Sequence, residues 1–527
     1  MSWVSVCTVD QLTNGPIVFR HQRLQIAVYQ TAKGLYAIDN RCPHEGYPLA
    51  EGTVDDNCVI TCNWHNWKFR LVDGDCILGG DHVRAYQVRQ EGEHILIDLS
   101  PPPADITERR ILDGLKVAFQ KQEYGRICRE ISRLHFSGLD PLIAVQHGLN
   151  WSYDKFEYGT THAFAACADW LTLYNHYKGH WDKQLVCLAE TVNHMAFDAL
   201  RHPEYPHFAE DIPWNGVAFC EGIEDEDRAS VESMMLTASH AEQPLKTCER
   251  ELTQSALAHY NDFGHSLIYV QKARELLQHL GSVYAPQILI PLARHLCYTT
   301  REDLIPEFSE YRPALNSCAE SFGTETLIDD LTGLQSGGIS GALQWTAQAT
   351  YRYTANSIYH SLLHICAENL LLFDLNNEAR VNNSVADNVG WLGFTHAITF
   401  ANAVREQCER FPEFWQQGLL QMACFIGRNQ RFRDLSVNRE QWAVQNEEQF
   451  FSKTHEIILD SGIRAPIFVA HYLKTTVAVQ AELQRAPKKT QAVLLAALNR
   501  FVQSPIKQKH SRRLANQAIA LVRRDYD

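Results

Sequence analysis

The spacing of apolar residues changes at a short proline run, and this change limits the chain to two differently built parts. Up to residue 100, apolar and polar residues alternate in short stretches such as 24–29 and 94–99. Alternation with period two predicts β-strands that bury one face. After Ser100-Pro101-Pro102-Pro103 the apolar period rises to about 3.6, which predicts amphipathic helices. We therefore predict a multidomain chain: a small all-β domain at 1–100, a stiff Pro-rich linker at 101–105 and a large all-α domain at 106–527.

Two loops in the β part each carry one cysteine and one histidine. Cys42 and His44 are separated by one residue, and Cys62 and His65 by two. Two thiolates and two imidazoles make a complete ligand set when hairpins bring such loops together. Residue types and spacing alone leave a zinc site and an iron–sulfur cluster open.

The residues around these loops resemble the Rieske [2Fe-2S] domain family. Its pattern Trp-His-x-Trp-x-Phe after the second cysteine is matched at 64–69. The resemblance covers about residues 3–100 and implies that Cys42 and Cys62 hold one iron, that His44 and His65 hold the other, and that the domain transfers single electrons. Neither loop has the extra cysteine of high-potential members, so the resemblance is to the low-potential type of bacterial ferredoxins and oxygenases. Asn66 stands where the family often has glycine, and asparagine tolerates the left-handed backbone of such a turn.

Composition excludes several classes of function. Lys and Arg number 48 and Asp and Glu 62, and the resulting net charge of −14 disfavours binding to nucleic acid or to anionic membranes. No apolar run reaches the roughly 18 residues that span a bilayer, and a secretory signal is missing. Most of the 15 cysteines fit small buried side chains in a reducing compartment, so we expect a cytoplasmic protein.

Histidines of the helical part provide a second set of candidate metal ligands. Each of two predicted helices carries three histidine or carboxylate residues that are spaced four apart, so the three side chains lie along one face of the helix. Facing helices with carboxylates and imidazoles hold non-haem iron in helical bundles. The alternative is that these residues make ordinary surface pairs. The two triads are Glu190, His194 and Asp198, and His360, His364 and Glu368.

A weak internal repeat adds further candidates. Segments 161–164, 264–267 and 395–398 each start with a small residue and a histidine, and a second apolar helix follows about 20 residues later. The pattern predicts stacked helical hairpins. It is distantly similar to questin-oxidase-like proteins, which are helical oxidoreductases. His162, His265 and His396, with His295 in a similar position, are interpreted as ligands, helix-terminal residues or buried hydrogen-bonding residues.

Two other motifs give alternative predictions. Asp198, His202 and His207 are spaced Asp-x3-His-x4-His, one residue longer than the pattern that holds mononuclear iron in Rieske oxygenases. The helical sequence around it also lacks the strands of that family's catalytic domain. The glycine-rich stretch 333–341 lacks the Lys-Ser/Thr of a phosphate loop and predicts a flexible loop or lid.

Together these features predict an oxidoreductase. An external reductase or ferredoxin would reduce the cluster, which would pass electrons to non-haem iron in the helical domain for O2-dependent oxidation of a small organic substrate. One alternative is an electron-transfer protein whose helical domain, without its own metal, docks a partner or binds a substrate. Another is direct reaction of a quinone-like substrate with the cluster. The sequence leaves the substrate, the reductase and the oligomeric state open.

Overall fold

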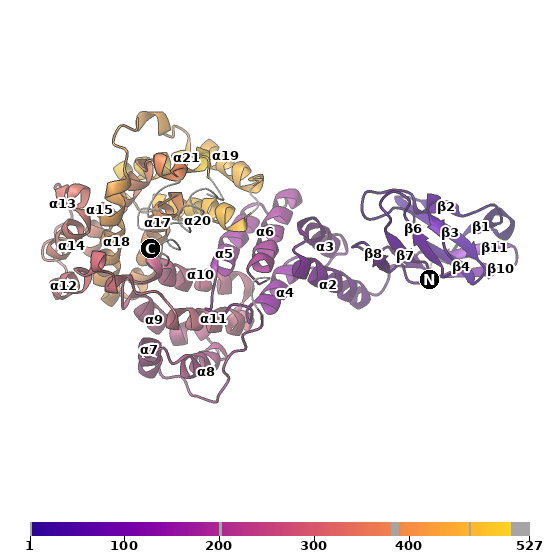
Figure 1. Cartoon of the computed structure of the whole chain (residues 1–527), viewed down its shortest axis with the longest axis horizontal. Coiled ribbons are helices and arrows are strands. Elements are labelled where there is room, and N and C mark those ends of the chain that lie inside the picture. Colours follow the sequence, from indigo (N-terminus) through magenta and orange to yellow (C-terminus); the bar gives the residue numbers. More distant parts are fainter. Residues whose placement is uncertain (1–2, 200–202, 381–388, 463–464, 507–527) are drawn as a thin grey trace, which may run out of the picture. The chain divides into compact units, whose positions relative to one another are not determined.

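The computed structural model describes residues 3–199, 203–380, 389–462 and 465–506 (Figure 1). The contacts divide the chain into two compact units, Met1–Pro141 and Leu142–Asp527. The strands lie in the first unit, and every named element of the described part of the second unit is a helix. The prediction of a small all-β domain followed by a large helical region is confirmed.

The β domain (residues 3–98) consists of three antiparallel sheets and a short helix α1 (Val9–Leu12). Its buried core includes Ile60 and Phe69, and both loop cysteines lie in the same core. The loop with Cys42 follows the second sheet, and the loop with Cys62 joins two strands of the third. The sheets are β1 (Trp3–Thr8), β11 (His94–Asp98) and β10 (Val88–Glu91); β2 (Ile17–His21), β3 (Leu24–Thr31), β4 (Gly34–Asp39) and β9 (Ala85–Tyr86); and β5 (Thr53–Val54), β6 (Val59–Thr61), β7 (Lys68–Arg70) and β8 (Cys76–Leu78).

Helices α2 (Ala104–Lys121) and α3 (Tyr124–Phe136) belong to the first unit, so the compact unit continues about 40 residues past the proline run. The reason is a buried carboxylate in the β domain. Asp81 is fully buried, and Arg126 and Arg133 of α3 lie 3.3 and 3.5 Å from its oxygens. Arg129 forms a third, short ion pair with the same carboxylate. This arginine clamp binds α3 to the β domain.

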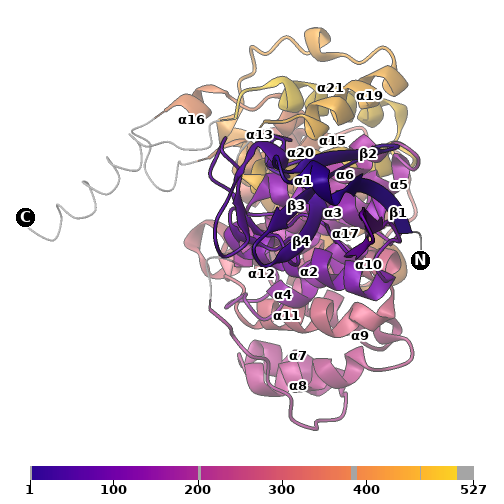
Figure 2. The same ribbon diagram turned by 90° about the vertical axis from the view of Figure 1, so that its right-hand side faces the viewer.

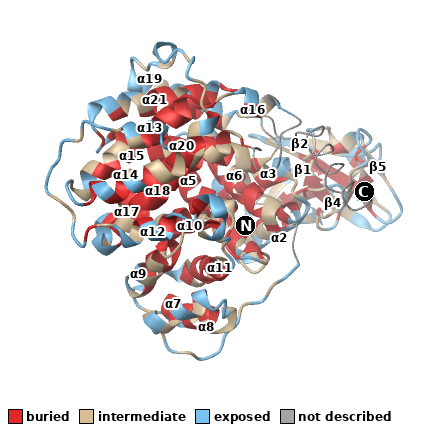
Figure 3. Ribbon diagram, turned by 60° about the vertical axis from the view of Figure 1, so that its left-hand side comes forward, coloured by how far each residue is buried: buried red, intermediate tan, exposed pale blue. Residues whose placement is uncertain are grey.

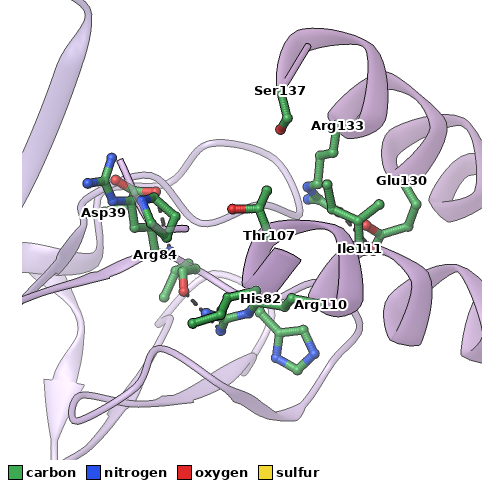
Figure 4. A pocket seen from close by; sticks show the side chains of 12 residues that line it. Asp39, His82, Arg84, Thr107, Arg110, Ile111, Glu130, Arg133 and Ser137 are labelled. Carbon is green, nitrogen blue, oxygen red and sulfur yellow. Dashed lines mark hydrogen bonds and ion pairs between the residues drawn. The ribbon is translucent and has the colours of Figure 1, made fainter. Parts of the chain in front are cut away.

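A pocket of about 270 Å³ lies where α2 and α3 meet the β domain (Figure 4). Three of its lining residues are the arginines Arg84, Arg110 and Arg133. Each guanidinium already has protein partners: Arg84 binds backbone carbonyl oxygens, Arg110 binds Asp75, and Arg133 binds Glu130. The positive charge of the pocket therefore serves packing between elements.

The second unit is built from helical hairpins, as predicted. The pairs α5 and α6, α10 and α11, and α17 and α18 each pack together. Of the described helices, none is long and apolar enough to cross a bilayer. The helices are α4 (Ile143–Ser152), α5 (His162–His176), α6 (Trp181–Ala199), α7 (Gly216–Glu224), α8 (Arg228–Ser239), α9 (Pro244–Leu257), α10 (His265–Leu280), α11 (Ala285–Cys297), α12 (Tyr311–Asn316), α13 (Thr332–Ser336), α14 (Gly338–Ala349), α15 (Ala355–Leu371), α16 (Asn376–Ala379), α17 (Trp391–Arg410), α18 (Trp415–Asn429), α19 (Glu447–Leu459), α20 (Pro466–Leu483) and α21 (Lys488–Gln503).

Four of these helices form a closed ring. Helix α5 packs against α10, α10 against α17, α17 against α20, and α20 back against α5 (Figure 1). Helices α7 and α8 pack against each other away from the ring (Figure 2). Large parts of the four ring helices are buried (Figure 3). The ring is therefore the inner part of the second unit, and polar side chains that point into it are shielded from water.

The prediction of a flexible loop at 333–341 is wrong, because this stretch forms α13 and the start of α14. Gly337 of this stretch allows a close approach, since a Cβ there would lie 2.7 Å from the Cα of Gly341. A Cβ at Gly427 of the facing helix α18 would lie only 2.3 Å from the Cα of Ile339 in α14. Small residues therefore let the two backbones approach, and the glycines do not mark a lid.

Candidate metal centres

The two loops of the β domain have the same backbone hydrogen bonds. In the first, the Cys42 N–H donates to the Tyr47 carbonyl (2.9 Å) and the Gly46 N–H donates to the Cys42 carbonyl (2.7 Å). In the second loop the Cys62 N–H donates to the Trp67 carbonyl (2.7 Å), and the Asn66 N–H donates to the Cys62 carbonyl (2.9 Å). These bonds fix the backbone of each loop, so the cysteine and the histidine of that loop keep a fixed position relative to each other.

The fourth residue after each cysteine has a left-handed backbone. Gly46 has φ +80° and Asn66 has φ +61°. Glycine adopts this conformation without strain, and asparagine is among the residues that tolerate it best. The departure from glycine at Asn66 therefore leaves the turn intact, as expected.

The four predicted ligands come from the two loops. The Nδ1 atoms of His44 and His65 lie 3.1 Å apart. The Cys42 and Cys62 side chains are almost fully buried in one core cluster and form no disulfide. Burial raises the pKa of the Cys42 thiol to about 11, so a bound metal is needed to hold it as a thiolate at neutral pH. Two free thiols and two facing imidazole nitrogens on these loops fit the ligand set of a Rieske cluster.

Aromatic side chains fix the histidines at the surface. The Trp67 ring stacks on His44 with centroids 4.8 Å apart, and Trp64 stacks on His65 at 5.6 Å. Trp67 has room for this only because residue 79 is glycine, where a Cβ would lie 2.4 Å from the indole. The His65 side chain is 37% exposed, so electrons can enter or leave through the imidazole end.

The comparisons with known proteins agree with this geometry. The model of the Rieske [2Fe-2S] domain matches residues 2–88. The 3-phenylpropionate/cinnamic acid dioxygenase ferredoxin subunit of Photorhabdus laumondii is 30% identical over 102 residues, which are 19% of this chain and 97% of the relative. The chain belongs to the Rieske [2Fe-2S] family. The Rieske domain is therefore an electron-transfer module for a [2Fe-2S] cluster.

Two further relatives match the Rieske domain over a similar length. The ferredoxin component of the alkene monooxygenase system of Xanthobacter autotrophicus is 28% identical over 20% of this chain and 88% of its own length. The solved ferredoxin of carbazole 1,9a-dioxygenase from Nocardioides aromaticivorans is 29% identical, with a TM-score of 0.18, over 19% of this chain and 100% of its own length. The helical unit lies outside these matches.

A second group of histidines lies inside the helical ring, with one residue from each helix. His162 and His265 are the first residues of α5 and α10, while His396 lies in α17 and His471 in α20. The Nε2 atoms of His162 and His265 are 3.2 Å apart, and those of His396 and His471 are 3.1 Å apart. The His265 and His396 rings are 4.3 Å apart, which joins the two pairs. We call these four residues the histidine cluster.

The outer nitrogens of the histidine cluster are held by neighbouring groups. His265 Nδ1 lies 2.6 Å from the Asp262 carbonyl oxygen, and His471 Nδ1 lies 2.6 Å from the Ile467 carbonyl oxygen. Since a carbonyl can only accept, both Nδ1 atoms carry the proton, and both neutral rings direct a lone pair from Nε2 into the cluster. The Tyr269 hydroxyl lies 3.2 Å from His162 Nδ1. Metal-binding histidines have this arrangement.

Burial keeps these imidazoles neutral. It lowers the pKa of His265 to about 4 and the pKa of His162, His396 and His471 well below the ordinary value. The ammonium of Lys474 lowers these pKa values further. Neutral imidazole is the form that binds metal ions, so the residues fit a metal site.

Three other predicted residues lie around the histidine cluster. His295 Nε2 is 3.2 Å from the Asp262 carboxylate. His194 Nε2 is 3.9 Å from the Asp198 carboxylate, which accepts a 2.6 Å hydrogen bond from the hydroxyl of Thr161, the residue before His162. These residues can orient the cluster histidines.

The structure does not bring the two predicted triads together as ligand sets. Eight helical residues rise about 12 Å, so the ends of one triad are too far apart to share an ion. His364 instead lies 3.4 Å from the Thr490 hydroxyl, and Glu368 accepts from Arg439. Neither Glu190 nor His360 joins them. Among the described residues, the groups of three or more close enough to hold one ion are His162, His265 and His396, and His44, Glu45 and His65.

His471 is the cluster residue that the sequence analysis missed. The signal was present, because Ala470-His471 is a further small-residue and histidine pair in an apolar helical stretch. The position of His471 in its helix does not set it apart, since His471 and His396 each lie five residues after the start of their helices, α20 and α17.

The alternative Rieske-oxygenase motif of Asp198, His202 and His207 stays a prediction, because His202 lies outside the described residues. The Arg294 guanidinium donates to His207 Nδ1 over 2.8 Å, and the Glu232 carboxylate is 3.8 Å from the same atom. His207 is therefore part of an ion-pair network that links the segment after α6 to α8 and α11.

Proposed function

We propose that the chain is a Rieske-dependent non-haem iron oxidoreductase. Cys42, His44, Cys62 and His65 would hold a [2Fe-2S] cluster that accepts electrons from an external reductase or ferredoxin. The histidine cluster would hold an iron ion, which would supply the chemistry for O2-dependent oxidation of a small organic substrate with electrons from the Rieske domain. The observation that carries the proposal is the convergence of four imidazoles from four helices, of which His396 and His471 are buried and His162 and His265 are partly buried.

The chemistry of the ligands favours iron. Imidazole binds zinc, copper, nickel and iron well, so the residues alone do not choose among these metals. Zinc has no redox chemistry and could not take electrons from a Rieske cluster. A [2Fe-2S] module on the same chain therefore supports a redox metal, and neutral histidines without a thiolate suit non-haem iron that keeps open coordination positions.

The residues around the histidine cluster have defined tasks. The carbonyl groups of Asp262 and Ile467 hold His265 and His471 in the tautomer that presents Nε2. His295 and the Asp262 carboxylate keep this part of the site fixed. The helical ring excludes bulk water, which strengthens electrostatic interactions within the site.

A second candidate function is electron transfer to a separate oxygenase, with the helical unit as a docking or substrate-binding scaffold. The relatives favour it, because the Xanthobacter protein is named as the ferredoxin component of a monooxygenase system. In that case the histidine cluster would be structural, and its substitution would leave electron transfer to an added acceptor protein unchanged.

Oxygen uptake after reduction of the cluster separates the two functions. The full chain, reduced chemically and mixed with O2, should consume O2 as the cluster is reoxidised. A His396→Gln and His471→Gln double variant should keep a normal cluster spectrum and lose most of this uptake. His360→Gln, outside the histidine cluster, is the matched control. Equal uptake by all three proteins would support the docking function.

A further inference from the structure

A strained turn leads into the histidine cluster at the start of α10. The three residues before His265 are Asp262, Phe263 and Gly264, which we call the left-handed turn, because their φ values are +44°, +44° and +80°. Glycine adopts this backbone without strain, but a bulky residue such as Phe263 does not. Among the described non-glycine residues with positive φ, Asp262 and Phe263 are the two that are adjacent in the chain. Strain of this kind needs surrounding contacts to hold it, and it is concentrated at functional sites.

The left-handed turn sets the orientation of the first residue of α10. The Asp262 carbonyl oxygen lies 2.6 Å from His265 Nδ1 and also accepts from the His265 backbone N–H. In a helix that continued towards its N-terminus, this carbonyl would accept from the N–H four residues further on and would not face an imidazole. The turn therefore directs the carbonyl to the ring whose Nε2 lies 3.2 Å from His162 Nε2.

Gly264 brings the left-handed turn close to a second helix of the ring. A Cβ at Gly264 would lie 2.6 Å from the Phe400 ring of α17. Phe400 follows His396 by four residues, so the two side chains lie along one face of α17. The turn thus also sets how closely α10 approaches α17, and the rings of His265 and His396 lie 4.3 Å apart.

The segment that follows α11 holds the left-handed turn. The Asp262 N–H donates to the Thr300 carbonyl over 3.0 Å, which fixes the start of the turn. At the centre of the turn, the Phe263 N–H donates to Glu302 Oε2 over 3.3 Å. The other carboxylate oxygen, Glu302 Oε1, accepts from the Thr300 hydroxyl over 2.6 Å. Glu302 is only 2% exposed, so its carboxylate is held by these protein donors in a place shielded from water.

Loss of the Glu302 carboxylate would act on His265 through the backbone. The Phe263 N–H would lose its acceptor, and the strained residue would gain by returning to an ordinary backbone. That change would carry the Asp262 carbonyl away from the His265 ring. The imidazole could then rotate and exchange its proton between the two nitrogens.

We propose that Glu302 is a positioning residue of the histidine cluster. It holds the left-handed turn and thereby fixes His265 with Nε2 directed at His162 and His396 before a metal ion binds. Its effect on metal affinity rests on the proposed function, whereas the state of the imidazole can be measured without metal. Outer partners of metal-binding histidines commonly change metal affinity by about 10- to 100-fold.

Four proteins are compared with the native full-length chain. Glu302→Ala removes the acceptor for the Phe263 N–H, and Glu302→Gln keeps an oxygen in its place. Glu249→Ala is the matched control, because Glu249 is a buried carboxylate that also anchors α10, through a 2.7 Å bond from Arg274. A double variant, Glu302→Ala with Phe263→Gly, replaces the strained residue by one that adopts left-handed backbone freely.

Two measurements report on the imidazole and on the metal. Nitrogen NMR of histidine-labelled protein without added metal shows which ring nitrogen of His265 carries the proton, and the His265→Gln variant identifies the signals. Calorimetry gives the affinity for Co²⁺, which binds imidazole as Fe²⁺ does, at the site that is lost in His162→Gln.

The native chain should show His265 with the proton fixed on Nδ1. Glu302→Ala should show a mixture of both protonated forms and bind Co²⁺ about 10-fold more weakly. Glu302→Gln, Glu249→Ala and the double variant should keep the native form of His265 and the native Co²⁺ affinity. Recovery in the double variant is the result that a general loss of stability would not produce.

A native form of His265 in Glu302→Ala would overturn the inference. A mixture that Glu249→Ala shares, or that Phe263→Gly does not reverse, would overturn it as well, because Glu302 would then support the helix and not the turn. A native chain that binds no Co²⁺ at the histidine cluster would overturn the proposed metal site. The positioning role of Glu302 would still stand if Glu302→Ala alone lost the fixed form of His265.

Discussion

His162 Nε2 and His265 Nε2 lie 3.2 Å apart, although 103 residues separate the two histidines in the chain. Each is the first residue of its helix, so the pairing of α5 with α10 brings both imidazoles to the same end of the ring. Burial of such polar rings costs free energy unless each nitrogen finds a partner. A shared metal ion would supply that partner for His162, His265 and His396, and His471 Nε2 lies 3.1 Å from His396 Nε2.

Substitution of a cluster cysteine should remove the iron–sulfur centre. Cys42→Ser should abolish the electron paramagnetic resonance signal of the reduced Rieske cluster, because a hydroxyl is a poor substitute for a thiolate ligand of iron. Cys58→Ser is the control, since Cys58 is buried in the same core but bonds to the Thr31 hydroxyl. Loss of the signal in both variants would show that the core, and not the ligand, was damaged.

A methyl group at Gly79 should disturb the cluster through Trp67. Gly79 and Gly15 have similar positive φ values of +132° and +125°, but only at Gly79 would a Cβ strike the indole that stacks on His44. Gly79→Ala should shift the reduction potential and the resonance spectrum of the cluster. Gly15→Ala carries similar backbone strain in open space and should leave both unchanged. An unaltered potential in Gly79→Ala would contradict a role for Trp67 in holding His44.

The arginine clamp should contribute strongly to the stability of the first unit. Asp81→Asn would remove the carboxylate that the three arginines share and leave the buried Arg126 with only its longer pairs to Glu123 and Glu130. The free energy of unfolding should fall by about 3 kcal/mol. Asp73→Asn breaks an exposed pair with Arg70 and should cost at most about 1 kcal/mol. The visible circular dichroism of the iron–sulfur cluster is lost when the first unit unfolds, so this signal measures the unfolding of the first unit alone. An equal decrease in the free energy of unfolding for both variants would contradict a stabilising role of the arginine clamp.

The ion-pair network of Glu232 should make the helical unit acid-sensitive. Burial by itself would raise the pKa of Glu232, but hydrogen bonds from His207, Arg294 and Arg228 hold it at about 2. Since this folded-state pKa is below the ordinary value of 4.5, the stabilisation is complete above pH 4.5 and is lost as the pH falls towards 2. Glu232→Gln should lower the melting temperature at pH 7 and flatten its fall between pH 4.5 and 3. If the melting temperatures of Glu232→Gln and of the native chain fell in parallel as the pH is lowered, the prediction would be wrong.

Much of the first centre could be predicted from sequence because its ligands lie in two short loops. Backbone hydrogen bonds within each loop fix the positions of Cys42 and His44, and likewise of Cys62 and His65. A short sequence motif is therefore enough to identify these ligands. The extension of the first unit to Pro141 could not be predicted in this way. It depends on Asp81 and Arg126, which are far apart in the chain and look like ordinary surface charges.

The second centre shows where sequence patterns fail. His162, His265 and His396 were found through a repeated pair of a small residue and a histidine, but their meeting depends on how four helices close into a ring. The triad on α15 had the more regular spacing, yet His360 and His364 lie outside that ring. Regular spacing along one helix shows only that the residues lie on the same face of that helix. A metal site needs residues from several helices to meet at one point.

The number of iron ions per chain tests the central claim most directly. Full-length protein reconstituted without oxygen should contain three irons for two sulfides, and Mössbauer spectroscopy should resolve one iron apart from the cluster. A His162→Gln and His396→Gln double variant should retain two irons and two sulfides with an unchanged cluster signal. Two irons per native chain, with none outside the cluster, would contradict the account.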